Sequence, residues 1–224
     1  MLSLLPFAGF ASDIAERTKP CEACHGDQGR AGPDGYYPRL AGKPAGYLYH
    51  QMQNFSQGRR HYVMMRRMME PLAPEYQQEM ANYFASLQVP YLANNLKNTV
   101  ATSAQMARGK QLALIGDSTL NLPACNTCHG KDLMGYGANV PGLLGLPSAY
   151  LGAQLSAWAL SERSTIEPDC MHEVVKRLNA FDTVAITAWL AAQDVPSKNS
   201  TPRSTLVHVD LRCGSAPELH EVTK

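Results

Sequence analysis

Apolar residues recur at steps of three and four along several stretches of the chain, the spacing that gathers them on one face of a helix. Two such stretches, 44–55 and 147–158, open with a proline, which favours the first turn of a helix. Two more, 74–87 and 180–192, run into Val-Pro steps that end helices. With a fifth at 104–114, they predict an all-α chain without a convincing sheet before residue 200.

The helical pattern occurs twice. The stretch PRLAGKPAGYLYHQMQNF (38–55) aligns with PGLLGLPSAYLGAQLSAW (141–158) at an offset of 103, and YFASLQVP (83–90) aligns with WLAAQDVP (189–196) at an offset of 106. Offsets this similar indicate one duplicated unit, whereas the repeats of a solenoid are much shorter. The predicted organisation therefore consists of four parts: residues 1–11 as the remnant of a secretory signal, 12–97 and 98–196 as the two units, and 197–224 as a C-terminal extension.

Length and charge exclude several classes of protein. The 224 residues carry a formal net charge of +1, which does not suggest binding to nucleic acid. The apolar N-terminal run is far shorter than the roughly 20 residues that cross a bilayer, and no other stretch approaches that length. We therefore expect at most a peripheral association with membranes.

Four of the six cysteines lie in two copies of one motif. CEACHG begins at Cys21 and CNTCHG at Cys125, so the motif residues are Cys21, Cys24 and His25, and Cys125, Cys128 and His129. In C-x-x-C-H both thiols add to the vinyl groups of a haem, and the adjacent histidine ligates its iron. The sequence thus predicts two covalently attached haem c groups, with His25 and His129 as iron ligands.

A pair of cysteines spaced C-x-x-C could instead form a redox-active dithiol or half of a zinc site. Both copies here continue with histidine and glycine, and neither has a second C-x-x-C pair nearby. These features favour haem attachment.

A second axial ligand converts a haem into an electron carrier, and methionine in that role raises the reduction potential. In the second unit Met171 lies seven residues before Leu178, and in the first unit Met65 lies seven residues before the aligned Leu72. The offset from Met65 to Met171 is 106, equal to that of the terminal helices. We therefore expect Met65 and Met171 to ligate iron; the alternatives at the first haem are Met64 and His61.

A histidine that ligates a metal usually donates its other ring N–H to a fixed acceptor. Pro38 and Pro141 occupy matching places after the two motifs, and their carbonyls are candidates for that acceptor. The alternative is that both prolines only form turns.

Taken together, these motifs and their order along the chain resemble the diheme cytochrome c4 family. The shared features are two CxxCHG motifs, the stretches YPRLAG and VPGLLG, and a methionine before helices that end in YFASL or WLAAQ. The resemblance covers about residues 15–196. It implies tandem cytochrome c domains, each a small helical fold around one covalent haem, with His/Met ligation through His25 with Met65 and His129 with Met171. It further implies periplasmic electron transfer, often to a terminal oxidase.

Two features depart from that family, namely the extension after residue 196 and the two cysteines that the haems do not use. In an oxidising compartment Cys170 and Cys213 are expected to be bridged. The bridge would hold the extension against the Met171 loop. The alternatives are free thiols, a bond to another subunit, or Cys170 as a haem ligand, as in diheme thiosulfate dehydrogenases.

The expected function is electron transfer between redox protein partners, from a dehydrogenase or cytochrome complex to an acceptor such as an oxidase. A diheme enzyme and a cytochrome subunit docked permanently on a dehydrogenase are the alternatives. Residues 12–97 hold ten basic and eight acidic side chains, against six and eight in 98–196. We expect a docking rim for an acidic partner in the first unit, formed by four arginines: Arg59, Arg60, Arg66 and Arg67.

Overall fold

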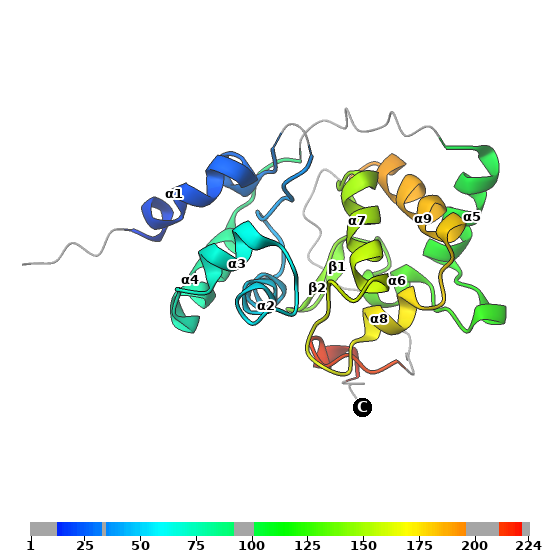
Figure 1. Cartoon of the computed structure of the whole chain (residues 1–224). Coiled ribbons are helices and arrows are strands. Elements are labelled where there is room, and N and C mark those ends of the chain that lie inside the picture. The colour runs from blue at the N-terminus through cyan, green and yellow to red at the C-terminus, as the bar shows by residue number, and fades with distance from the viewer. Residues whose placement is uncertain (1–12, 33–34, 92–100, 196–210, 221–224) are drawn as a thin grey trace, which may run out of the picture.

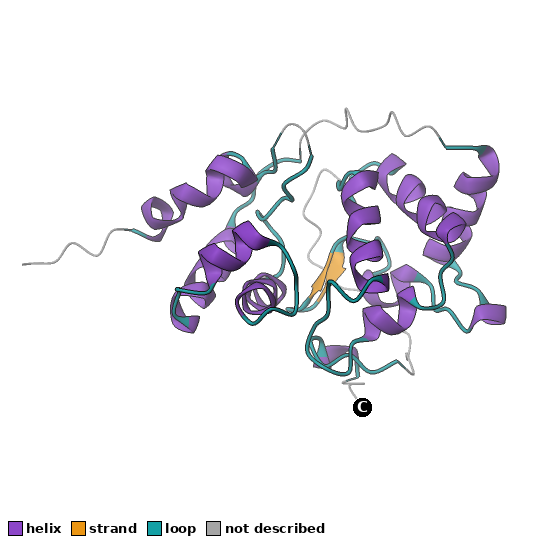
Figure 2. Cartoon of the chain, viewed as in Figure 1, coloured by secondary structure: helices purple, strands orange, loops and turns teal. Residues whose placement is uncertain are grey.

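The computed structural model describes residues 13–32, 35–91, 101–195 and 211–220. Helices make up most of these ranges, and one small hairpin is the only sheet among them (Figures 1 and 2). The predicted helical fold is therefore confirmed. None of the helices in the described ranges is long and apolar enough to cross a membrane. The signal-like segment and the predicted boundary between residues 97 and 98 lie outside the described residues, so both stay predictions.

The described residues of the first unit form four α-helices: α1 (Ile14–His25), α2 (Ala45–Ser56), α3 (Val63–Met69) and α4 (Pro74–Ser86). Helix α2 follows Pro44 and α4 begins at Pro74, as the sequence predicts. A core of Leu48, Ala81 and Phe84 joins α2 to α4. The core lies beside the end of α1, because Cys21 packs against it.

The second unit contains α5 (Ser103–Leu114), α6 (Cys125–His129), α7 (Ser148–Ala159), α8 (Cys170–Val175) and α9 (Ala180–Ala192). Helices α5 and α9 each begin with a capping box. The Thr102 and Asn179 side chains each accept from a backbone N–H three residues on, and the residue there returns the bond, so otherwise unpaired helix N–H groups are satisfied.

Helices α5 and α9 pack closely along each other, and Gly109 is the residue that permits this. A Cβ atom at Gly109 would overlap the Ala185 carbonyl and the Trp189 side chain. The crossing is also tied by Arg108, which donates to the Asp117 and Asp182 carboxylates at 2.7 Å each. The two helices thus form a rigid frame on which the rest of the second unit is built.

The sequence pattern did not reveal the hairpin, β1 (Gly135–Tyr136) and β2 (Val140–Pro141). The strands are antiparallel, with Gly135 opposite Pro141. Strands of two residues are too short to show the alternation that identifies a strand. The hairpin matters because it carries Pro141 to its place beneath His129.

We expect Gly109→Ala to destabilise the protein by about 1–3 kcal/mol, because the added methyl group has no room between α5 and α9. Gly152→Ala is the matched control, since a Cβ at this helical glycine meets nothing within 4 Å. The control should be neutral or stabilise by up to about 1 kcal/mol through helix propensity. Thermal unfolding of both variants checks the packing; equal melting temperatures would contradict it.

Candidate functional site

Both C-x-x-C-H motifs end a helix and turn sharply at the glycine that follows. Gly26 closes α1 with φ 75° and Gly130 closes α6 with φ 85°, a region that side chains disfavour. A Cβ at Gly26 would overlap the Ala31 carbonyl, and one at Gly130 would crowd the Gly135 carbonyl. Glycine is therefore required after each histidine for the chain to fold back beneath the imidazole.

The two histidines are held by the same hydrogen bond. Nδ1 of His25 lies 2.8 Å from the Pro38 carbonyl, and Nδ1 of His129 lies 2.8 Å from the Pro141 carbonyl. A carbonyl only accepts, so Nδ1 carries the proton in each ring and Nε2 keeps a lone pair. Burial lowers the pKa of both imidazoles and favours the neutral form that can bind a metal. Of the two alternatives for Pro38 and Pro141, the structure therefore shows the one in which their carbonyls accept from the histidines.

Three of the four motif thiols, those of Cys21, Cys125 and Cys128, pack against apolar clusters, whereas Cys24 is exposed. Cys125 packs against the main core of the second unit, and burial raises its pKa to about 12. Burial likewise raises the pKa of Cys128 to about 11. Neither C-x-x-C pair forms a disulfide, and the described residues contain no cluster of three metal-binding side chains. The arrangement disfavours a redox dithiol or a zinc site, both of which need thiolates, and suits thioethers at the edge of an apolar porphyrin.

Met65 and Met171 occupy corresponding helices. Met65 lies in α3 and Met171 in α8, the short helix that precedes the terminal helix of each unit, and both side chains are half-buried. Met69 belongs to the protein core at 3% exposure, whereas Met64 is 58% exposed. His61 is also exposed. The equivalent placement agrees with the alignment that selected Met65 and Met171, and their role as iron ligands stays a prediction.

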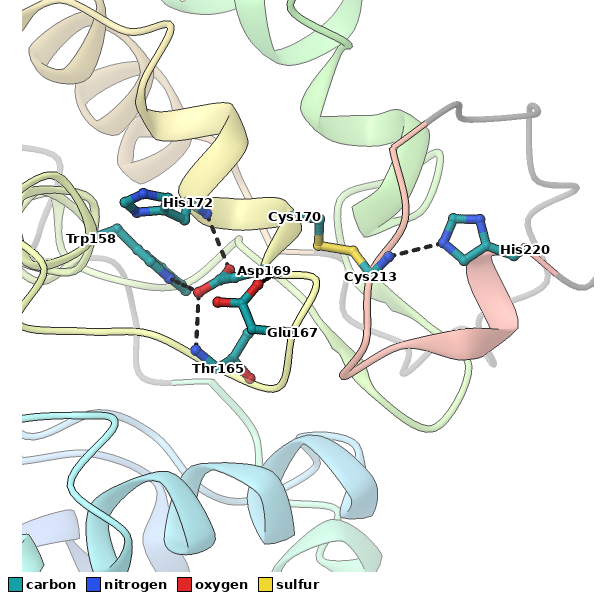
Figure 3. Close-up of a disulfide and its surroundings, with 8 residues drawn as sticks. All are labelled: Trp158, Thr165, Glu167, Asp169, Cys170, His172, Cys213 and His220. Carbon is teal, nitrogen blue, oxygen red and sulfur yellow. Dashed lines mark hydrogen bonds between the residues drawn. A yellow bond between two sulfur atoms is a disulfide. The ribbon is translucent and has the colours of Figure 1, made fainter.

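The expected bridge between Cys170 and Cys213 is present, with Cα atoms 5.0 Å apart (Figure 3). Cys170 is the first residue of α8, directly before Met171. The alternative in which Cys170 supplies a thiolate to a haem is therefore wrong, because its sulfur is bonded to Cys213.

Asp169, to which no sequence motif points, orders the loop that leads into α8 (Figure 3). Its carboxylate is 4% exposed and accepts from the Thr165 backbone at 2.9 Å and from the Trp158 indole at 3.1 Å. It also caps α8 by accepting from the His172 backbone at 3.1 Å. These three bonds, together with the disulfide, fix the helix that carries Met171.

Two arginines related by the duplication meet between the units. Arg60 and Arg163 face each other in a short antiparallel bridge, with Arg60 over the Phe55 ring and Arg163 over the Trp158 ring. The two guanidinium groups share two acceptors, the Oε1 atoms of Gln51 and Gln154, at 2.6 to 3.0 Å. The contact is nearly symmetric, since each partner recurs at an offset of 103.

The prediction that Arg60 belongs to a docking rim in the first unit is wrong, because its guanidinium points into this interface. Arg59 also faces the second unit in part, since its carbonyl accepts from the Ser164 backbone at 2.6 Å. Arg66 and Arg67 remain exposed on α3. The sequence could not separate the two pairs, because charge alone does not tell which face of a loop meets another domain.

Lys43, Arg60 and Arg163 lie at this interface, and none of them has a carboxylate partner among the described residues. Arg163 is 4% exposed, and burial with the nearby Arg60 charge lowers its pKa to about 10. Lys43 is 5% exposed and donates to the Gly142 carbonyl at 2.8 Å, and burial lowers its pKa to about 8. Buried cations normally have an anion. A haem carries two propionate carboxylates, so this donor set fits that group.

We expect Gln154→Leu to destabilise the haem-loaded protein by about 1.5–3 kcal/mol, the range for hydrogen bonds to charged groups. The change leaves both Arg60 and Arg163 short of an acceptor. Gln111→Leu, at an exposed position of α5, is the control. Denaturant unfolding compares the two, and equal loss of stability in both variants would argue against the shared-acceptor arrangement.

No protein-family model matches the chain. The thiosulfate dehydrogenase electron acceptor of Thiomonas intermedia (strain K12) is 38% identical over 184 residues, which cover 82% of this chain and 83% of that protein. The crystal structure of reduced recombinant cytochrome c4 from Pseudomonas stutzeri superposes with a TM-score of 0.68 at 27% identity, covering 81% of this chain and 97% of that one. A thiosulfate dehydrogenase structure from Marichromatium purpuratum gives a TM-score of 0.68 at 32% identity, covering 85% of this chain and 43% of that one.

Proposed function

Because the chain belongs to the diheme cytochrome c4 family, we propose that it takes electrons from a thiosulfate dehydrogenase and passes them to an acceptor such as a terminal oxidase. It is an electron-transfer protein rather than an enzyme, and it carries two covalently attached haem c groups. The partner is proposed from the relative in Thiomonas, whose name gives it that role. Disulfide formation and haem attachment both favour the periplasm as the compartment.

The residues that would hold the first haem are Cys21 and Cys24 through thioethers, with His25 and Met65 as iron ligands. Cys125, Cys128, His129 and Met171 have the same roles in the second unit. Once bound, each haem supplies a one-electron couple between ferric and ferrous iron. The proposal is supported above all by the duplicated hydrogen bond of 2.8 Å, which leaves Nε2 of both histidines available to ligate iron.

The chain's own residues set the conditions for transfer. Pro38 and Pro141 hold the imidazoles in one tautomer, so the ligands need not reorient as the charge on iron changes. The apolar cores around Cys21 and Cys125 exclude water from one side of each site. The buried cations Lys43 and Arg163 and the partly buried Arg60 would hold the propionates and favour the reduced state.

We expect the ferric protein to show the weak far-red band of sulfur-to-iron ligation. Met65→Ala and Met171→Ala should each remove about half of it and lower one of the two reduction potentials, because methionine ligation raises the potential. Met64→Ala is the control for the first unit and should keep the full band. If Met64→Ala removes half of the band and Met65→Ala does not, the ligand assignment in the first unit is wrong.

For the electron donor, we expect a thiosulfate dehydrogenase with thiosulfate to reduce both haems of the chain in a stopped-flow experiment. Reversing the charge of the exposed pair, Arg66→Glu with Arg67→Glu, should slow this reduction roughly tenfold at low salt and much less at high salt. Lys110→Glu, an exposed charge on α5, serves as the control and should change little. Failure of the dehydrogenase to reduce the wild-type chain would exclude it as the donor.

A second candidate is a lasting complex with the dehydrogenase. This candidate is favoured by the thiosulfate dehydrogenase structure from Marichromatium, because the present protein matches a region that makes up 43% of that longer chain. Co-elution of the two proteins at physiological salt in size-exclusion chromatography would support a permanent complex, and separate elution would leave a diffusing carrier.

A further inference from the structure

The C-terminal segment Leu211–His220, here called the tail, lies against the second haem site. Its side chains Cys213, Ala216 and Leu219 are each 5% exposed and form one apolar cluster with Val140 of the hairpin. Cys128, the second cysteine of the haem motif, packs against this cluster. A thioether at Cys128 would place one edge of the porphyrin at this sulfur, next to the tail.

Several polar contacts fasten the tail besides the disulfide. Both oxygens of the Glu218 carboxylate accept from the Asn139 side chain, at 2.9 and 3.1 Å, and one also accepts from the Asn139 backbone at 2.9 Å. Gly214 donates to the Pro168 carbonyl at 2.9 Å. Within the tail, the backbone of Cys213 donates to Nε2 of His220 at 3.0 Å (Figure 3). The segment is thus held at both ends and along its length.

The tail also lies close to the first unit, at the place where α2 meets the hairpin. The Tyr47 backbone donates to the Ala138 carbonyl at 3.1 Å. Burial lowers the pKa of His50 on α2, and the nearby Glu218 carboxylate and Ser215 backbone partly oppose this effect. Figure 1 shows the tail beside α8.

The first unit differs at the equivalent position. Cys24 corresponds to Cys128 at the motif offset of 104, yet Cys24 is exposed, whereas Cys128 is partly covered. None of the described residues packs on Cys24 as the tail packs on Cys128. The duplication therefore produced two similar sites, and the tail makes them unequal.

We propose that the tail is a cover over the Cys128 edge of the second haem, and that protein partners consequently exchange electrons at the Cys24 edge of the first unit. The proposal rests on the haem attachment described under the proposed function. It gives the second haem the role of an internal partner that is reached through the first.

The wild-type protein provides the first test. A neutral gadolinium chelate broadens the NMR signals of haem methyl groups that lie near solvent. We expect strong broadening of the methyl signals of the first haem and weak broadening of those of the second; the reverse order would contradict the proposal. Equal broadening of both haems would overturn the proposal. An alkaline pyridine spectrum first counts the haems. Fewer than two haems per chain would refute the proposed attachment, and with it the proposed cover.

The full-chain variant Cys170→Ser/Cys213→Ser/Leu219→Asp should release the tail, because it removes the bridge and places a charge in the apolar cluster. Hydrogen exchange at Cys213 and Leu219 reports the release. The methyl signals of both haems should then broaden alike. Ferricyanide, which takes one electron from each iron, should oxidise the slower haem several-fold faster. Arg212→Asp, an exposed change on the same segment, should leave the wild-type pattern intact. A released tail with an unchanged second haem would also overturn the proposal.

Discussion

The hydrogen bond from each histidine Nδ1 to a proline carbonyl is the interaction on which the rest of the structure depends. It sets the tautomer and therefore the nitrogen that can face iron. To make it, the chain needs a glycine with positive φ after each histidine and a loop that returns a proline beneath the ring. In the second unit the small hairpin performs this return, and the remaining helices position the motif and the methionine helix around it.

The interface between the units adds a second constraint. Arg60 and Arg163 share the oxygens of Gln51 and Gln154, which aligns the two units through a nearly symmetric contact. Symmetric packing alone would make the two sites equivalent. Lys43 and the tail break the equivalence, because Lys43 reaches from the first unit to Gly142, beside Pro141, and the tail packs only on the second unit's Cys128.

Much of this organisation could be predicted from sequence, because covalent haem attachment needs a fixed local motif and a duplication preserves offsets. The helices at 44–55 and 147–158, the Pro38 and Pro141 contacts and the Cys170–Cys213 bridge follow from local pattern or simple counting. The role of Arg60 could not be predicted, because the sequence shows that a residue is charged but not which domain its side chain faces. Arg163 and Lys43 were missed for the same reason, and the hairpin was too short to leave a periodic signal.

Iron K-edge X-ray absorption can determine whether both irons have the proposed His/Met ligation. With this ligation each iron should show one sulfur neighbour, at a thioether distance, in both oxidation states. An average of half a sulfur per iron, or only nitrogen neighbours, would contradict it.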